Sequence, residues 1–301
     1  MFILMVGCPA SGKSTWAKKF AEHKAEREEE VYIVSSDAIR EELFGDERIQ
    51  RDPTKVFDLA HKRIINALEA GYEYVIFDAT NITRKNRTAL MNKIAHIHDE
   101  KRCVVFAEPY QILCERNKSR SREVPQEVIW RMITQFEVPL YSEGYDDIYI
   151  VNHNTLDMDE HLQAMCGYNQ HNPHHRLDLF DHCFRAGTFI LNRFNDSPDY
   201  LLQAALMHDI GKPYVRTFKN AKGETTDVAH YYNHENVGGY FALMFKTDWT
   251  TENRLKIAQL ISYHMVPYRL DSEKAKERWK NRLGELYEDV MKLHEADKFA
   301  H

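Results

Sequence analysis

Six side chains in the second half of the chain have the types that bind divalent metals. The apolar helical run LLQAALM is followed directly by His208 and Asp209, within the motif HDIGKP. Imidazole and carboxylate groups suit Mn, Fe, Co, Ni, Zn and Mg. The candidate set, whose members come from several different predicted helices or helix ends, is His182, His208, Asp209, His234, His264 and Asp297. We therefore expect one or two of these metals here, with Asp209 bridging, although each histidine taken alone is more typical of a structural role.

The stretch GCPASGKST at residues 7–15 fits the pattern of a nucleotide phosphate loop. It follows an apolar strand pattern and precedes a helical one, which is the context that the motif requires and which argues against a chance match. Backbone N–H groups and the start of the helix would hold the phosphates of ATP or another NTP. Lys13 would reach the terminal phosphates and Ser14 would bind Mg²⁺. The loop residues that would bind the cofactor are Gly7, Gly12, Lys13, Ser14 and Thr15.

An aspartate and an arginine one helical turn apart follow the second predicted strand, in SSDAIREEL. Asp37 and Arg40 would lie at the carboxyl edge of the sheet and face the phosphate site. There Asp37 could accept the proton of an attacking hydroxyl, and Arg40 could hold a phosphate of the acceptor. The alternative is a helix-capping aspartate paired with a surface arginine.

Two further motifs would complete a phosphoryl-transfer site. In FDATN, Asp78 ends the third predicted strand, where it could orient Mg²⁺ or water, and Thr80 and Asn81 follow in the loop. In RNKSRSREVP, Arg116 and Arg120 are one turn apart and could reach the transferring phosphoryl group from a lid. A basic run is also typical of a solvated face, so this motif is weaker than the phosphate loop.

The elements around these motifs predict an α/β domain followed by an all-α domain. FILMVG, VYIVS, YEYVIFDA, KRCVVFAE and DIYIV read as buried strands that alternate with helical patterns, which favours a parallel sheet with helices on both faces. The clearest predicted helix lies between Asp52 and Gly71. Asp52 could cap its start, Pro53 suits its first turn, and Gly71 would end it. From about residue 171 only helical periodicity remains. We place a phosphate-loop domain at 1–152, a polar linker at 153–170 and the all-α domain at 171–301.

Composition narrows the class of protein. The 301 residues have a formal net charge of −6, which argues against a general nucleic-acid coat but not against an enzyme that grips the end of a strand. The five cysteines are scattered and odd in number, which fits a reducing compartment. The apolar start is too short for a signal peptide or a membrane span, so we expect no membrane association and a cytoplasmic location.

Residues 1–152 resemble the kinase domain of phage-type polynucleotide kinases. The shared features, in matching order, are the phosphate loop, D-x-x-R after the second strand, an Asp followed by an Asn after the third, and the paired arginines of the lid. Ala10 stands where that family commonly has Gly, and small kinases of nucleosides, sugars and antibiotics share much of the pattern. The resemblance implies that Lys13 and Ser14 bind ATP and Mg²⁺ and that Asp37 is the general base. It also implies that Arg40 grips the acceptor phosphate and that Arg120 binds donor phosphates.

The ordered set H…HD…H…H…D resembles the HD-superfamily phosphohydrolases. The segments HNPHHRLDLFDHCFRAG and ALMHDIGKP are most similar to the HD domains attached to tRNA nucleotidyltransferases, which act on phosphoesters including 2′,3′-cyclic phosphates. This resemblance implies that Arg185 and Lys212 neutralise the substrate phosphate and that the metals supply the attacking hydroxide. Four other histidines could line the substrate entrance or lie on the surface: His171, His174, His175 and His230.

A phosphate-adding and a phosphate-removing domain on one chain suit the two ends of a nucleic-acid strand. The arrangement resembles the bacterial HD-domain polynucleotide kinases, in which the two domains stand in the opposite order. It implies that the substrates are RNA or DNA ends and that the kinase domain phosphorylates a 5′-OH. The HD domain would hydrolyse a 2′,3′-cyclic phosphate, with the 2′ or 3′ monophosphate as a further candidate substrate. It also implies a functional partnership with a ligase. The alternatives are a nucleoside or nucleotide kinase fused to an HD nucleotidase, and a regulatory module that only senses nucleotide.

Overall fold

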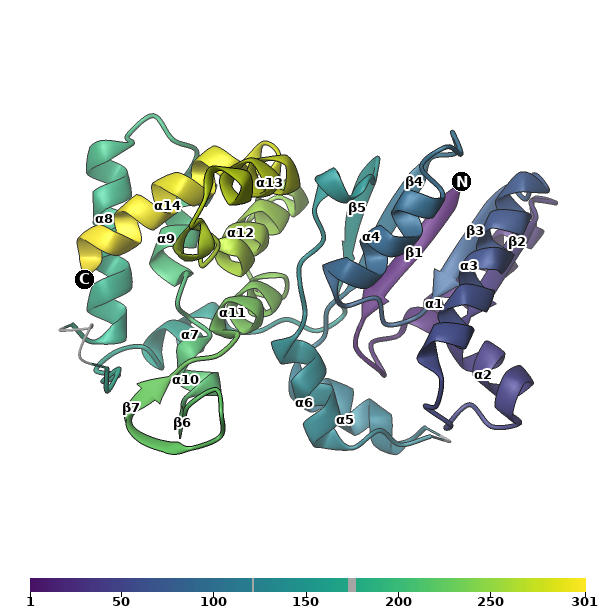
Figure 1. The fold of residues 1–301 in the computed structure, drawn as a ribbon, viewed down its shortest axis with the longest axis horizontal. Coiled ribbons are helices and arrows are strands. Elements are labelled where there is room, and N and C mark those ends of the chain that lie inside the picture. Colours follow the sequence, from purple (N-terminus) through teal and green to yellow (C-terminus); the bar gives the residue numbers. More distant parts are fainter. Residues whose placement is uncertain (121, 173–176) are drawn as a thin grey trace. The chain divides into compact units, whose positions relative to one another are not determined.

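The computed structural model describes residues 1–120, 122–172 and 177–301, and the chain forms two compact units. The first unit comprises residues 1–132 and 143–153, and the second comprises residues 133–142 and 154–301. One unit is built around a sheet and the other mainly from helices (Figure 1). Within the described ranges, no helix combines the length and the apolar character that a membrane span needs.

Five parallel strands form the sheet of the first unit, in the order β2-β3-β1-β4-β5. Their bounds are Phe2–Gly7 for β1, Val31–Ser35 for β2, Tyr74–Asp78 for β3, Lys101–Phe106 for β4 and Asp147–Val151 for β5. The central strand β1 is buried along its whole length because it has a neighbour on each side and a helical layer on each face. All five strands lie within the predicted runs, so the predicted parallel sheet is confirmed.

Helices cover both faces of this sheet. They are α1 (Lys13–Ala25), α2 (Ser36–Phe44), α3 (Pro53–Glu69), α4 (Arg84–Lys93), α5 (Tyr110–Lys118) and α6 (Gln126–Thr134). α1 packs Trp16 and Ala17 against the face that contains Ile76. On α3, the ring of Phe57 lies 6.4 Å from the ring of Phe77. Because consecutive strand residues point to opposite faces, the contacts of Ile76 and Phe77 place α1 and α3 on opposite sides.

Local sequence signals explain where α3 begins and ends. The side chain of Asp52 accepts a hydrogen bond from the backbone N–H of Lys55, and Pro53 occupies the first turn. At the other end Gly71 has a φ of 83°, a conformation that glycine adopts without strain. The helix therefore has the cap, the first-turn proline and the terminating glycine that its sequence predicts.

The second unit is largely helical. Its helices are α7 (Met158–Gln163), α8 (Leu179–Arg193), α9 (Asp199–Met207), α10 (Lys212–Val215), α11 (His234–Ala242), α12 (Thr251–Tyr263), α13 (Glu273–Leu283) and α14 (Leu286–Ala300), with a short 3₁₀ turn, η2, at Pro267–Arg269. α8 packs against α9 and α14, and α12 packs against α9, α11 and α14. These packed helices position the predicted metal ligands.

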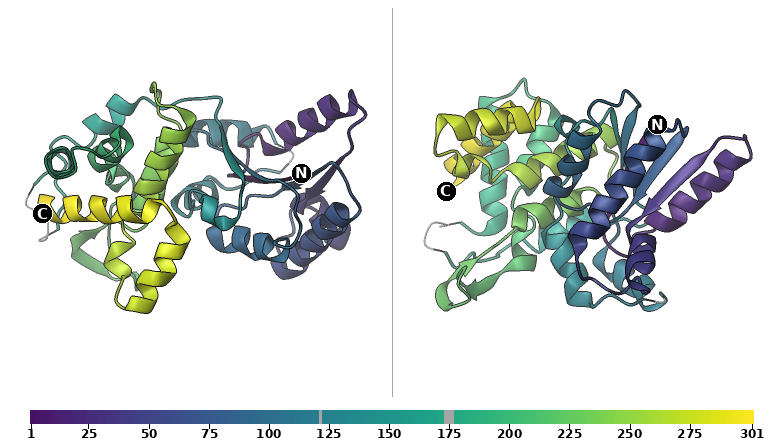
Figure 2. Two further views of the ribbon diagram at one scale, coloured as in Figure 1. Left: turned by 90° about the horizontal axis from the view of Figure 1, so that it is seen from above. Right: turned by 45° about the vertical axis from the view of Figure 1, so that its right-hand side comes forward.

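A two-stranded antiparallel hairpin departs from the predicted all-α character of this region. It joins β6 (Thr217–Lys219) to β7 (Thr225–His230) and is drawn in green in Figure 2. The hairpin turns at Gly223, whose φ is 82°. Its strands are short and consist mainly of polar and β-branched residues, so they carry little of the apolar signal that identified the strands of the first unit.

The segment 133–142 packs entirely within the second unit. The ring of Phe136 lies 4.9 Å from that of Tyr240. The backbone carbonyls of Val138 and Pro139 accept hydrogen bonds from Tyr263 Oη at 3.0 Å and Gln259 Nε2 at 2.6 Å. The end of α6 and the stretch that follows it are therefore part of the core that packs against α11 and α12.

Candidate nucleotide and metal sites

The phosphate loop connects β1 to α1 in a conformation that depends on small residues. Gly12 has a φ of 95°, and Ala10 has a φ of 63°, which explains why glycine suits its position. A Cβ on Gly7 would lie 2.7 Å from Ser11 Oγ and 2.8 Å from the carbonyl oxygen of Phe106. The close packing of this loop against β4 therefore excludes larger side chains at Gly7.

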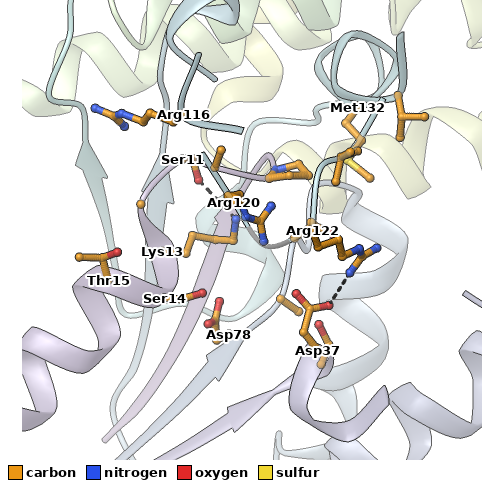
Figure 3. A pocket seen from close by; sticks show the side chains of 18 of the residues that line it. Ser11, Lys13, Ser14, Thr15, Asp37, Asp78, Arg116, Arg120, Arg122 and Met132 are labelled. Atoms are coloured by element: carbon orange, nitrogen blue, oxygen red, sulfur yellow. Dashed lines mark hydrogen bonds and ion pairs between the residues drawn. The ribbon is translucent and has the colours of Figure 1, made fainter. Parts of the chain in front are cut away.

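Lys13 is held over this loop. Its Nζ donates hydrogen bonds to the carbonyl oxygens of Gly7 and Cys8, at 2.9 and 2.8 Å. Burial lowers the pKa of Lys13, and the nearby positive charge of Arg120 lowers it further, whereas Asp78 opposes the shift. Lys13 and Arg120 point into the same region of the pocket, with Ser14 and Asp78 close by (Figure 3). The two cations converge where the loop's backbone would place nucleotide phosphates.

The pocket around this loop has a volume of about 1060 Å³ and a strongly basic lining. Among the residues that the structure describes, eight basic and three acidic side chains line it. The basic ones are Lys13, Lys19, Arg40, Arg48, Arg116, Arg120, Arg122 and Arg131, and the acidic ones are Asp37, Asp78 and Glu123. Thr15 and Thr80 also line it. The chain as a whole has a net charge of −6, so positive charge is concentrated at this pocket.

Asp37 sits in the first turn of α2, at the pocket wall. The cap of α2 is Ser35, whose side chain accepts from the N–H of Ala38, so the side chain of Asp37 is not used for capping. Its Oδ1 accepts from Nη1 of Arg40 at 2.8 Å and from Nη1 of Arg122 at 3.3 Å. Arg122 belongs to the basic run in which we predicted Arg116 and Arg120 as functional. In the sequence, Arg122 is distinguished only by its position two residues after Arg120.

A buried ion pair supports the loop that follows β3. Asp78 pairs in register with Ser35, which places it at the same sheet edge as Asp37. Asn81 Nδ2 donates to the carbonyl of Met5 at 2.9 Å. Arg87 donates to the carbonyl of Asn81 at 3.1 Å and to both carboxylate oxygens of Glu143, at 2.7 and 2.8 Å. This network holds the Asp78 loop against β1.

Arg116 lies at the pocket wall but is directed away from Lys13 (Figure 3). Its Nη1 lies 3.1 Å from Oε1 of Glu108, a fully buried carboxylate after β4. The same oxygen lies 2.9 Å from Nδ1 of His153. Glu108 therefore ties the start of the lid to the end of β5, a contact that the sequence pattern did not suggest. Arg116 remains a proposed contact of the donor nucleotide.

In the second unit, the six predicted ligands converge in one buried cluster with two halves. His182, His208 and Asp297 form the first half, with Nε2 of His182 at 3.1 Å and Nε2 of His208 at 3.4 Å from Oδ1 of Asp297. His234 and His264 form the second half, with their Nε2 atoms at 3.0 and 3.6 Å from Oδ1 of Asp209.

Asp209 joins the two halves. While its Oδ1 faces His234 and His264, its Oδ2 lies 3.5 Å from Nε2 of His208 and 3.6 Å from Nε2 of His182. One carboxylate oxygen thus serves each half of the cluster. This is the arrangement expected of a carboxylate that bridges two divalent metals.

Backbone contacts fix the tautomers of three of the imidazoles. Nδ1 of His208, His234 and His264 lies 2.7 to 2.8 Å from the carbonyl oxygen three residues earlier in each case. A carbonyl oxygen only accepts, so each Nδ1 donates and each neutral ring presents Nε2 as an acceptor. Nε2 of His234 and Nε2 of His264 then face each other at 3.2 Å as two acceptors, an arrangement that a shared cation would stabilise. The donor set therefore fits a metal site.

The HDIGKP motif is explained by close contacts around Asp209. Burial alone would raise the pKa of Asp209, but Lys212 and the neighbouring imidazoles hold it well below its ordinary value. Lys212 Nζ donates to Oε1 of Gln170 at 2.8 Å, and Gln170 is itself buried. A Cβ on Gly211 would lie 2.1 Å from the carbonyl oxygen of His234, so only glycine lets α10 and α11 approach this closely.

The remaining candidates lie apart from this cluster or outside the described residues. Arg185 is exposed on α8, and its guanidinium lies 5.2 Å from the ring centroid of Phe299. His171 packs against Phe218 and His230 stacks on Tyr232, while His174 and His175 lie outside the described residues. Sequence reasoning missed other residues that reach the cluster, and no motif marks them: Gln170 in an irregular segment, Cys183 on α8, Tyr268 in η2 and His301 after α14.

Two parts of the chain match known families. Residues 2–139 match the family described as "AAA domain", and residues 179–300 match the family described as "HD domain". The L-seryl-tRNA(Sec) kinase of Methanococcus maripaludis is 29% identical over 174 residues, which cover 56% of this chain and 66% of that protein. The A-adding tRNA nucleotidyltransferase of Deinococcus radiodurans is 34% identical over 134 residues, which cover 42% of this chain and 28% of that protein. The chain thus spans less than two thirds of the length of these relatives.

Solved structures give partial matches to this chain. A chain of the Pnkp1/Rnl/Hen1 RNA repair complex is 25% identical, with a TM-score of 0.37 and coverage of 44% of this chain and 43% of that chain. A putative kinase from Chloroflexus aurantiacus is 18% identical, with a TM-score of 0.41 and coverage of 50% and 84%. Taken with the phosphate loop and the buried histidine cluster, the family matches show that this chain carries an N-terminal P-loop kinase domain followed by a C-terminal HD domain.

Proposed function

We propose that this protein heals the ends of nucleic-acid strands. The kinase domain would phosphorylate 5′-OH ends with ATP and Mg²⁺. The HD domain would hydrolyse 2′,3′-cyclic phosphate ends, and the resulting 2′ or 3′ monophosphate is a further candidate substrate. The observation that carries the proposal is the concentration of guanidinium groups on the acceptor side of the kinase pocket.

That acceptor side is marked by Asp37 and carries more positive charge than a neutral acceptor needs. Arg40, Arg48 and Arg122 line the pocket near it, and Arg122 also donates to the carbonyl of Glu47 at 3.2 Å. The hydroxyl of a free nucleoside has no charge for these groups to bind. The 5′ end of a strand has phosphodiesters one nucleotide away, and arginine binds such oxygens in a paired geometry.

The geometry supports a defined role for each kinase residue. Asp37 accepts the proton of the attacking hydroxyl, and Arg40 fixes its carboxylate and grips the acceptor phosphate. Lys13 and Arg120 neutralise charge on the transferring phosphoryl group, and Ser14 and Asp78 bind Mg²⁺ directly or through water.

In the HD domain the chain's own residues would hold the metals and orient the phosphoester. The six buried ligands would bind one or two divalent metals, which supply an activated water and polarise the phosphate. Lys212 and Gln170, beside the bridging carboxylate, would hold a phosphate oxygen. Arg185 is an outer phosphate contact in this proposal, since it lies one helical turn beyond His182.

The names of the curated relatives support nucleic-acid substrates. The two relatives described above, and a CC-adding tRNA nucleotidyltransferase of Thermus thermophilus that is 31% identical over 142 residues, are all named for reactions on tRNA. Hydrolysis of the cyclic phosphate, followed by hydrolysis of the resulting monophosphate, would leave a 3′-OH. A 5′-phosphate and a 3′-OH are the ends that a ligase joins, so we also propose a functional partnership with a ligase. The scattered free cysteines support the expected cytoplasmic location.

A second candidate function is a nucleoside or nucleotide kinase fused to an HD nucleotidase. The net charge of −6 favours it, because a long basic surface for a strand is not evident from the composition. A competition assay distinguishes the two: a 5′-OH oligoribonucleotide and a mixture of nucleosides are offered with labelled ATP. We expect the label on the oligonucleotide, with a KM that rises steeply with salt. Label only on the nucleosides would support the second function and contradict end healing.

A further inference from the structure

Tyr268 contacts the metal-ligand cluster through its hydroxyl and is also exposed to solvent. Its hydroxyl donates to Oδ2 of Asp297 at 2.8 Å, while Oδ1 of Asp297 faces His182 and His208. Even so, 48% of the residue is exposed. The ring therefore extends from the candidate metal site to the surface.

The position of this ring is well defined by its neighbours. Tyr268 lies in η2, just after His264, and Pro267 restricts the backbone that precedes it. The ring makes an edge-to-face contact with His294 of α14, with ring centroids 4.6 Å apart and planes at 90°. One such contact leaves part of the aromatic surface open, which agrees with the exposed fraction. The hydrogen bond to Asp297 and the contact with His294 thus hold an exposed aromatic surface at the edge of the cluster.

We propose that Tyr268 is the stacking platform for the base of the nucleotide whose phosphate occupies the metal site. The inference rests on the proposed phosphoesterase function and adds its substrate class, namely phosphoesters that carry a nucleobase beside the scissile phosphate. The order of metal ligand, hydroxyl and exposed ring follows the order of phosphate, sugar and base in a nucleotide. Aromatic stacking accepts any base, so the platform favours nucleotides without selecting a sequence.

The competing explanation is that Tyr268 only orients Asp297 through its hydroxyl. Two substitutions separate the roles: Tyr268→Phe keeps the ring and loses the hydroxyl, whereas Tyr268→Leu loses both. Tyr149→Leu is the matched control, because Tyr149 is a similarly exposed tyrosine on β5 of the kinase unit. Metal content and circular dichroism of each full-length variant establish that the cluster and fold are retained.

The test compares two substrates that differ only in the base, adenosine 2′,3′-cyclic phosphate and methyl ribofuranoside 2′,3′-cyclic phosphate, at saturating Mn²⁺. We expect Tyr268→Leu to raise the KM for the adenosine substrate about 10-fold and to leave the KM for the riboside unchanged, with Tyr268→Phe and Tyr149→Leu close to the wild type for both. Calorimetric binding of 2′-AMP and of ribose 2-phosphate gives a second readout without turnover, with the same selective loss.

Two results would overturn the platform: equal effects of Tyr268→Leu on both substrates, or no effect on either in turnover and binding. Failure of the proposed function gives a different pattern, because the wild type would then hydrolyse neither cyclic phosphate. In that case the 2′-AMP binding comparison still decides whether the ring recognises a base.

Discussion

Lys212 Nζ lies 2.6 Å from Oδ2 of Asp209, the carboxylate that joins the two halves of the histidine cluster. Both groups are nearly fully buried, so neither charge is compensated by solvent. The HD motif therefore combines, within five residues, a histidine ligand, the bridging carboxylate, a glycine that allows close helix packing and a cation for the substrate.

Asp209→Asn is expected to disrupt both halves of the cluster at once. The amide has the same shape as the carboxylate but no charge and only one acceptor oxygen, so it cannot serve His208 and His234 together. We expect the metal content to fall to background and the phosphoesterase activity to be lost, while the kinase activity stays within about 2-fold of the wild type. Elemental analysis and the two activity assays measure these effects.

Asp297→Asn is the matched comparison, because Asp297 belongs to the half formed with His182 and His208, whereas Asp209 contacts imidazoles of both halves. This variant should retain metal in the half formed by His234 and His264. If Asp209→Asn and Asp297→Asn lost the same amount of metal, Asp209 would not act as a bridge.

Asp37→Asn is expected to abolish most phosphoryl transfer and spare the HD reaction. Loss of a general base lowers kcat by roughly 10²- to 10⁴-fold, while ATP binding through the phosphate loop should change little. Asp58→Asn serves as the control, since Asp58 is an exposed aspartate on α3. A kcat within a few-fold of the wild type in Asp37→Asn would refute the assignment of the base.

The buried pair of Arg87 and Glu143 predicts an asymmetry between single and double substitutions. Neither side chain is exposed to solvent, and removal of Arg87 would leave a buried carboxylate without its main partner. We expect Arg87→Met to lower the free energy of unfolding by about 3–5 kcal/mol, and Arg87→Met/Glu143→Leu to recover much of that loss. Urea titrations followed by tryptophan fluorescence test this, and a double variant as unstable as the single one would argue against it.

His61 predicts a loss of stability on acidification. Burial lowers its pKa from 6.5 to about 4, and Lys93 at 3.1 Å from its Nδ1 adds to the shift. The unfolded chain therefore takes up a proton below pH 6.5 that the folded chain resists down to about pH 4, so acidification through this range favours unfolding. Allowing for screening of Lys93, the effect between pH 7 and pH 5 is on the order of 1 kcal/mol.

His61→Gln removes this titration, so its free energy of unfolding should fall less between pH 7 and pH 5 than that of the wild type. Urea titrations at the two pH values measure the difference. Equal pH dependence in the two proteins would show that His61 is not protected from protonation by the fold.

The sheet and the metal cluster could be predicted because their signals are strong and ordered along the chain. The strand from Phe2 to Gly7 is apolar throughout because it is central, and the phosphate loop must follow such a strand. The HD ligands could be collected from their types alone, and the structure brings all six together. Their division into two halves depends on which oxygen of Asp209 faces which imidazole, and that follows only from three-dimensional packing.

Other contacts left no mark in the sequence. The strands of the hairpin at 217–230 are too short and polar to be recognised, and nothing in the segment 133–142 indicates that it packs beneath α11 and α12. Arg116 and Arg122 look equivalent in a basic run, yet one pairs with the buried Glu108 and the other with Asp37. The two arginines have the same chemistry and similar local sequence, so the sequence does not distinguish them. Tertiary packing determines which partner each one has.

The most direct test of end healing is one incubation of a short RNA that has a 5′-OH and a 2′,3′-cyclic phosphate. Labelled ATP and Mg²⁺ are supplied, with Mn²⁺ or Ni²⁺ in parallel, and both ends of the RNA are analysed. We predict that the label appears at the 5′ end and that the cyclic phosphate is lost, with Asp37→Asn blocking only the first change and Asp209→Asn only the second. An RNA unchanged at both ends, while the same protein phosphorylates free nucleosides or hydrolyses free nucleotides, would contradict the proposal.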